Sequence, residues 1–181
     1  MDHFDVHVHP SAARLPRERQ LAWHIAHFAA NAANPERDVR ALVAARMIDS
    51  LAVALPTLNR RPVRTARAMA LAHPRLNGAL LLGLPDIVTV HAEWAAWANG
   101  TAVRELDFND TFLAADYSHP ADSIAPLLAV AQQTGRDGKT LTLAIATAYE
   151  VQVALVKAIS LHAQKKDHVA HLAPAMVAGL G

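Results

Sequence analysis

The sequence predicts an all-α fold with one multi-helix domain, and three observations favour it. Apolar residues make up 52% of the 181 residues and charged residues 18%. The apolar residues gather in long stretches rich in Ala and Leu, which are strong helix formers, and the chain has only seven glycines. Within these stretches apolar positions recur every three or four residues, which is the spacing of a helix with one buried face.

The first part of the chain predicts an arm and then a helix. Residues 1–16 show no apolar period and are mostly polar, so we expect a flexible N-terminal arm there. Leu21, Ile25 and Phe28 share one face at helical spacing, which predicts a helix over residues 17–32.

Two further helices are expected before the middle of the chain. Asn34-Pro35 offers a cap and a proline at the first helical position, which predicts a helix over residues 36–54 that ends before Pro56. A third helix is predicted over residues 62–72. We expect the broad apolar surface of the second helix to be buried against several neighbours. The residues of that surface are Val39, Leu42, Val43, Met47, Leu51 and Val53.

The middle of the chain predicts a connection and a fourth helix. His73-Pro74 and Asn77-Gly78 are typical of turns. Residues 80–84 could form a short strand or a buried extended piece, and they are the only β candidate. The fourth helix is expected over residues 91–106, and it delivers an acidic segment.

The last third predicts two complete helices and the start of another. One helix is expected from Asp122 or Ser123 to Gln133, and a long one over residues 139–161. Residues 174–181 have the pattern of the first turns of a further apolar helix. Because that helix would leave an apolar face uncovered, we expect residues 17–181 to be an incomplete helical domain of a longer protein.

Charge, cysteine content and hydropathy exclude several classes of binding partner and cellular location. The formal net charge of +1 gives no field that would recruit nucleic acid. The absence of cysteine excludes disulfides, thiolate catalysis and Cys-ligated metals. The N-terminus has no apolar signal segment, and polar residues and prolines interrupt the apolar runs before they reach the roughly 20 residues that cross a bilayer. We therefore expect a soluble cytoplasmic protein that binds neither nucleic acid nor membrane.

The densest polar cluster follows the fourth predicted helix, over residues 104–111, and a second polar stretch follows at residues 116–120. If the helix continued to Thr111, then Asp107, Asp110 and Thr111 would share one face. A carboxylate beside a hydroxyl and a histidine can transfer protons. A solvated helix end with a turn histidine fits the same residues, and the pattern by itself favours that interpretation.

Residues 93–111, EWAAWANGTAVRELDFNDT, and Ser118-His119-Pro120 resemble the motif of the MmgE/PrpD family of lyases and isomerases. Residues 104–107, 113–117 and 167–172 resemble the family members that dehydrate 2-methylcitrate. The resemblance implies an all-helical domain, with a smaller α/β domain that is absent from these residues. It also implies a homodimer that acts on small polycarboxylates without a metal or organic cofactor.

The resemblance further implies three catalytic residues, Asp107, His119 and His171. Asp107 and His119 would be the acid–base pair that removes water from 2-methylcitrate in propionate catabolism. Decarboxylation or epimerisation of another polycarboxylate would use the same kind of site. The family's other pocket residues would lie beyond Gly181, so the pocket of this chain is expected to be incomplete and its activity doubtful.

Three residues are expected to bind the substrate. Thr111 would donate a hydrogen bond, as the resemblance implies. Arg104 and His168 are nearby sources of positive charge for the substrate carboxylates. A non-catalytic helical module that binds a partner through an exposed apolar face is the alternative to an enzyme.

Two other histidine patterns could form metal sites. Asp5 to His9 contains the His-x-His of metal-dependent amidohydrolases, but no buried strand precedes it and their barrel needs about 200 residues or more. His162, His168 and His171, beside two lysines, could form a metal cluster, a polyanion site or a solvated loop. A solvated loop with one functional histidine is the interpretation that we prefer.

Overall fold

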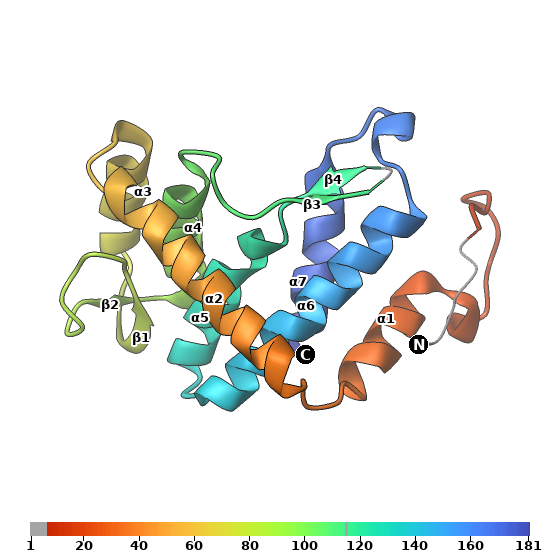
Figure 1. Ribbon diagram of the computed structural model, residues 1–181, viewed down its shortest axis with the longest axis horizontal. Coiled ribbons are helices and arrows are strands. Elements are labelled where there is room, and N and C mark those ends of the chain that lie inside the picture. Colours follow the sequence, from red (N-terminus) through yellow and green to blue (C-terminus); the bar gives the residue numbers. More distant parts are fainter. Residues whose placement is uncertain (1–6, 115) are drawn as a thin grey trace.

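The structure is a computed structural model that describes residues 7–114 and 116–181 (Figure 1). Helices dominate it, which confirms the predicted all-α fold class. The helices of the described residues are α1 (Leu21–Ala30), α2 (Arg37–Ala54), α3 (Arg61–Leu71), α4 (Ala92–Arg104), α5 (Ile124–Gln133), α6 (Gly138–Ala158) and α7 (Leu172–Leu180). The short strands are β1 (Pro74–Leu80), β2 (Thr89–Val90), β3 (Phe112–Leu113) and β4 (Tyr117–Ser118).

Helix α5 lies between two groups of elements. On one side α4 packs on α5 and α3, next to the β1–β2 hairpin. On the other side α6 packs on α7, and α1 lies against α7. Helix α2 crosses the molecule and contacts both α4 and α6 (Figure 1).

Small side chains allow α4 to approach its neighbours closely. Ala92, Ala95, Ala98 and Ala102 recur at intervals of three and four residues and are all buried. This spacing puts them on one face of the helix, and their size lets the backbones of the packed helices come close together. The motif that delivers the polar cluster therefore starts from a well-packed helix.

The long helix α6 forms the second packing centre. The Asp137 carboxylate caps its first turn by accepting the Thr140 backbone N–H at 2.8 Å. Ile145, Ala148 and Val156 along the helix are fully buried. Helix α7 covers part of this surface with Ala175 and Ala178.

Gly179 in α7 is expected to be sensitive to substitution. A Cβ at this position would lie 2.6 Å from the Ala144 backbone oxygen and 3.1 Å from Leu127. Gly179→Ala should therefore destabilise the fold by about 1–3 kcal/mol, because a backbone oxygen cannot move aside cheaply. Gly100→Ala is the control, since a Cβ at Gly100 in α4 would meet nothing within 4 Å.

The control should be stabilised by about 0.5–1 kcal/mol, because alanine favours a helix interior over glycine. Urea unfolding followed by circular dichroism measures both changes. Equal effects of the two substitutions would contradict this packing of α7 against α6.

The helix ends differ from the expected ones by a few residues. Residues 17–19 form a separate 3₁₀ turn before α1, and residues 7–16 form no helix or strand. Helix α2 begins at Arg37 with Glu36 as its cap residue, so Pro35 lies outside the first helical turn. Helix α6 ends at Ala158, because Ile159 adopts an extended backbone.

The apolar surface of α2 is less buried than we expected. Only Val43 among its large apolar residues is buried, whereas Leu42 is 54% exposed and Ile48 68% exposed. The prediction of a broad buried surface is wrong because α2 contacts its neighbours mainly along one face, through α4 and α6.

The structure contains more extended segments than the sequence predicted. Strand β1 pairs antiparallel with β2, with Ala79 opposite Val90, and β3 pairs antiparallel with β4. The expectation of one β candidate at residues 80–84 was wrong, because β1 ends at Leu80. Two- and seven-residue strands joined by short loops carry too little alternation to be recognised from pattern alone.

Helix α6 is also long and apolar enough to cross a membrane by length and composition. This differs from the expectation that every apolar run is too short. Within the structure α6 contacts α2, α5 and α7, and its buried residues face them. Core helices of globular domains commonly pass the same test, so α6 alone gives weak evidence of a membrane span.

Candidate active site

The polar cluster begins where α4 ends at Arg104. Asp107 adopts a left-handed backbone with a φ of 55°, and its N–H donates to the Arg104 carbonyl at 3.1 Å. A left-handed residue ends a helix, because an L-side chain there crowds the backbone. Asp107, Asp110 and Thr111 therefore do not share a helical face, and that expectation is corrected.

His119 is brought to this cluster by the loop that carries β3 and β4. The side chain is 8% exposed, and its Nδ1 lies 2.8 Å from the Asp110 backbone oxygen. The Thr111 hydroxyl is 3.3 Å from the same nitrogen. His119 Nε2 lies 4.0 Å from the Asp107 carboxylate, so the structure brings Asp107, Thr111 and His119 together.

These contacts assign the tautomer of a neutral His119. A carbonyl oxygen only accepts hydrogen bonds, so His119 Nδ1 must carry the proton that it shares with Asp110. Nε2 then has a free lone pair, and it is the nitrogen that faces Asp107. A buried imidazole held in this way can take a proton from a bound molecule.

The other two predicted histidines lie on the turn that precedes α7, residues 168–171. The His168 ring packs 5.3 Å from the His119 ring and 4.9 Å from Tyr117, measured between centroids. Neither ring nitrogen of His168 has a hydrogen-bond partner among the described residues, and the same is true of His171 Nε2. His168 Nδ1 is 3.2 Å from Asp167 but lacks the geometry of a hydrogen bond.

Asp116 connects the β3–β4 loop, which carries His119, to the segment that contains His162. Its buried carboxylate accepts the His162 backbone N–H at 3.0 Å and contacts His162 Nδ1 and the Ser160 hydroxyl. These hydrogen bonds from His162 hold the pKa of Asp116 well below its usual range. Asp116 therefore fixes the segment before residues 168–171 against the β3–β4 hairpin.

The Arg104 guanidinium contacts three side chains of this chain. Its guanidinium lies 2.8 Å from Asp107, 2.7 Å from the Asn109 side-chain oxygen and 3.6 Å from Asp122. Burial raises the pKa of Asp122, and the positive charge of Arg104 opposes that rise. These contacts favour a role for Arg104 in holding the loop, in place of the expected direct binding of substrate.

Several residues near the site were not among the predicted site residues. Tyr117 packs against three imidazoles, and Asp116 clamps His162. Asp122 and Asn109 complete the surroundings of Arg104. Their polar types are visible in the sequence, but the pairings join positions 13 to 46 residues apart, which no local pattern marks.

The two metal hypotheses gain no geometric support. In the part of the chain that the structure describes, no group of three His, Cys, Asp or Glu side chains is placed to hold a metal ion. Asp5 and Val6, which precede the His-x-His, lie outside the described residues, and its two histidines, His7 and His9, are exposed.

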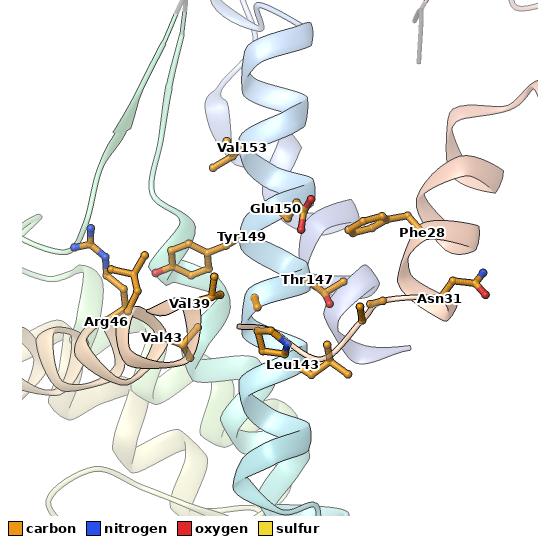
Figure 2. A pocket seen from close by; sticks show the side chains of 15 residues that line it. Phe28, Asn31, Val39, Val43, Arg46, Leu143, Thr147, Tyr149, Glu150 and Val153 are labelled. Atoms are coloured by element: carbon orange, nitrogen blue, oxygen red, sulfur yellow. The ribbon is translucent and has the colours of Figure 1, made fainter. Parts of the chain in front are cut away.

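Two hollows of the surface lie beside the cluster. One, of about 570 Å³, lies between α1, α2 and α6, with Arg46 and Tyr149 on one side of it and Phe28 on the other (Figure 2). The other, of about 660 Å³, lies between α4, α5 and α7 and includes Arg104 and Asp122. Neither of these two hollows includes Asp107, Thr111 or a histidine of the cluster.

His171 is expected to make stability depend on pH. Burial lowers its pKa below the usual 6.5, with His168 acting in the same direction and Asp116 opposing. The folded state then binds a proton less readily than the unfolded chain. Its contribution to stability is complete above pH 6.5 and is lost as the pH falls through the lowered pKa.

Melting temperatures between pH 8 and pH 5 should therefore fall with acidification, and they should fall less in His171→Asn. His9→Asn, on the exposed arm, should follow the wild-type curve. The same slope in wild type and His171→Asn would refute this role for the buried ring.

The fold and the cluster define a helical domain that gathers carboxylate, hydroxyl and imidazole groups at one place. Residues 19–181 match the MmgE/PrpD N-terminal domain, so the chain belongs to the MmgE/PrpD family. This confirms the resemblance that the motif at residues 93–111 indicated.

Curated relatives share shorter stretches with the chain. It is 41% identical to a 2-methylcitrate dehydratase of Escherichia coli K12 over 64 residues, which are 35% of this chain and 13% of the relative. It is 36% identical to the Cupriavidus necator 2-methylcitrate dehydratase over 85 residues, 41% of this chain and 18% of the relative. It is 34% identical to a probable 2-methylcitrate dehydratase of Saccharomyces cerevisiae over 87 residues, which are 41% of this chain and 17% of the relative. The matched part thus spans less than a fifth of these relatives.

Proposed function

We propose that this chain provides part of the active site of a lyase that removes water from 2-methylcitrate and gives 2-methylaconitate. The observation that carries the proposal is the buried His119 with its Nδ1 proton held by a backbone carbonyl and its Nε2 free. The partial similarity to 2-methylcitrate dehydratases supports the choice of substrate.

The elimination needs a base and an acid. His119 Nε2 would take the proton from the carbon next to a carboxylate, as the carbon–oxygen bond of the neighbouring hydroxyl breaks. The imidazolium that forms lies 4.0 Å from the Asp107 carboxylate, which stabilises its charge. Asp107 would start protonated and give its proton to the departing hydroxyl, which leaves as water, so that the carboxylate facing the imidazolium is the one that this step forms. Its side chain is 70% exposed, so it can take a proton back from solvent.

The substrate would carry three carboxylates into the site. His168 and His171 carry buried ring nitrogens without a hydrogen-bond partner within the described residues, and these would hydrogen-bond a carboxylate once substrate binding exposes them. The Thr111 hydroxyl cannot donate to the protonated Nδ1 of His119, which leaves its own proton free for the substrate. Arg104 would act through Asp107, whose carboxylate it holds.

The test is incubation of the full chain with 2-methylcitrate, with products identified by proton NMR. We expect 2-methylaconitate, and loss of carbon dioxide or an inverted centre would point to another polycarboxylate reaction. A His7→Ala, His9→Ala double variant in the exposed arm should behave as wild type. The proposal fails if no product forms and 2-methylcitrate leaves the ring resonances of His119 and His168 unmoved.

A further inference from the structure

The Asp110 side chain gathers contacts from three separate elements. Its Oδ1 accepts the Ala121 backbone N–H at 2.8 Å, at the start of the turn that leads into α5. Its Oδ2 accepts the Tyr149 hydroxyl of α6 at 2.8 Å and lies 3.7 Å from Arg46 Nε of α2. The carboxylate is 5% exposed, so these groups replace almost all of its water.

The backbone of the same residue holds His119. The Asp110 carbonyl accepts the His119 Nδ1–H at 2.8 Å, whereas the hydrogen bonds of the Asp110 carboxylate go to Ala121 and Tyr149. The Ala121 bond closes the loop from residue 110 to residue 121, and His119 lies inside that loop. Anchoring the side chain therefore fixes the carbonyl that orients the ring.

We infer that Asp110 is a positioning residue for His119, which sets the tautomer and orientation of that ring through its anchored backbone carbonyl. The inference rests on the proposed function only in taking His119 as the base. It assigns the Arg46–Asp110–Tyr149 network to the site although none of these side chains is placed to touch a substrate beside Nε2. Figure 2 shows the Tyr149 ring of α6 pointing toward α2 and Arg46, on one side of the hollow.

In the Arg46–Asp110–Tyr149 network the proton stays on the Tyr149 hydroxyl. Burial raises the pKa of the Tyr149 hydroxyl, and the Asp110 carboxylate raises it further. The phenol therefore stays protonated at neutral pH and donates a hydrogen bond to Asp110. Arg46 is always charged and places a positive charge 3.7 Å from the Asp110 carboxylate.

The experiment reads the His119 ring directly, by nitrogen-15 NMR of histidine-labelled full chain at a pH where the ring is neutral. The His119 resonances are identified by their loss in His119→Gln. In wild type we expect the Nδ1–H tautomer in about tenfold excess, because one hydrogen bond to the carbonyl favours it.

Asp110→Asn keeps the backbone carbonyl and the side-chain shape, so any change in His119 must come through the anchoring network. We expect the tautomer excess to fall by roughly threefold or more. Tyr149→Phe removes a single donor and should lower the excess in the same direction. Asp137→Asn is the matched control, since the Asp137 carboxylate also accepts a backbone N–H, at 2.8 Å, but caps the first turn of α6 and contacts no described residue of the cluster that holds His119.

A folded Asp110→Asn with the wild-type tautomer ratio overturns the inference. If Asp110→Asn fails to fold, Tyr149→Phe decides, and an unchanged ratio in that variant overturns it as well. Because the ring is observed without turnover, a chain that does not dehydrate 2-methylcitrate leaves this result intact. If the tautomer ratio of His119 shifts in Asp110→Asn but the wild-type chain does not dehydrate 2-methylcitrate, the positioning role of Asp110 stands and the proposed reaction is rejected.

Discussion

Replacing His119 by alanine is expected to lower the rate of 2-methylcitrate dehydration by about 10²–10⁴-fold, the usual contribution of a positioned general base. The loss should appear in kcat, because the lone pair of Nε2 acts on the reacting carbon–hydrogen bond. Substrate binding should change much less, since the residues that we propose to bind the substrate, His168, His171 and Thr111, remain.

The comparison needs variants that separate chemistry from packing, because His119 is buried. His119→Gln keeps a side-chain N–H that can reach the Asp110 carbonyl, but it has no basic nitrogen. Compared with His119→Ala, the His119→Gln variant should have a melting temperature closer to that of wild type, but its rate of dehydration should stay low. His27→Ala removes an exposed histidine of α1 outside the cluster, and it should keep most of the activity. Turnover of His119→Gln within about threefold of wild type would exclude His119 as the base.

The helices were predictable because their signals are local. The alanines of α4 recur on one face, and the apolar positions of α6 recur over five turns. Each pattern needs no knowledge of what the helix packs against. The exposed apolar face of α2 shows the limit of such patterns, because periodicity gives the face but not the number of neighbours that cover it.

The residues of the site were predicted better than their arrangement. The motif placed Asp107, Thr111 and His119 in one region, and the structure brings them together. The left-handed turn at Asp107 could not be read from the sequence, since Asp is tolerated in many turn conformations.

Long-range pairings were beyond the reach of the sequence for a different reason. Asp116 meets His162 across 46 positions, and Asp110 meets Tyr149 across 39. Such contacts depend on how α6 and the following turn pack against the loop, and each polar residue has many equally suitable partners along the chain. The structure adds contacts that the sequence did not show: the Asp110 carboxylate accepts hydrogen bonds from Ala121 and Tyr149, and Arg104 contacts Asp107 and Asn109, whereas its predicted role in binding substrate stays a prediction.

Replacing Arg104 by methionine should destabilise the fold by about 2 kcal/mol at pH 7. Methionine keeps the apolar stem but leaves Asp122 ionised and buried without its cation. Loss of one partner of a fully buried ion pair costs about 3–5 kcal/mol. We expect about 2 kcal/mol here, because the Arg104 side chain is 34% exposed and solvent screens part of its charge. Urea unfolding of both proteins measures the difference.

The dependence of that deficit on pH identifies its cause. Burial already raises the pKa of Asp122 above its usual 3.8, so this group favours the folded state at pH values below 3.8, and that contribution is lost as the pH rises through the raised pKa. Removing Arg104 raises the pKa further, so the deficit of Arg104→Met should be largest at pH 7 and should shrink as acidification protonates Asp122. Arg104→Met combined with Asp122→Asn should recover most of the lost stability at pH 7, because no buried charge remains, and Asn can still accept the Asn109 amide. If Arg104 instead served only to bind substrate carboxylates, the single variant would unfold like wild type at every pH and the second substitution would restore nothing.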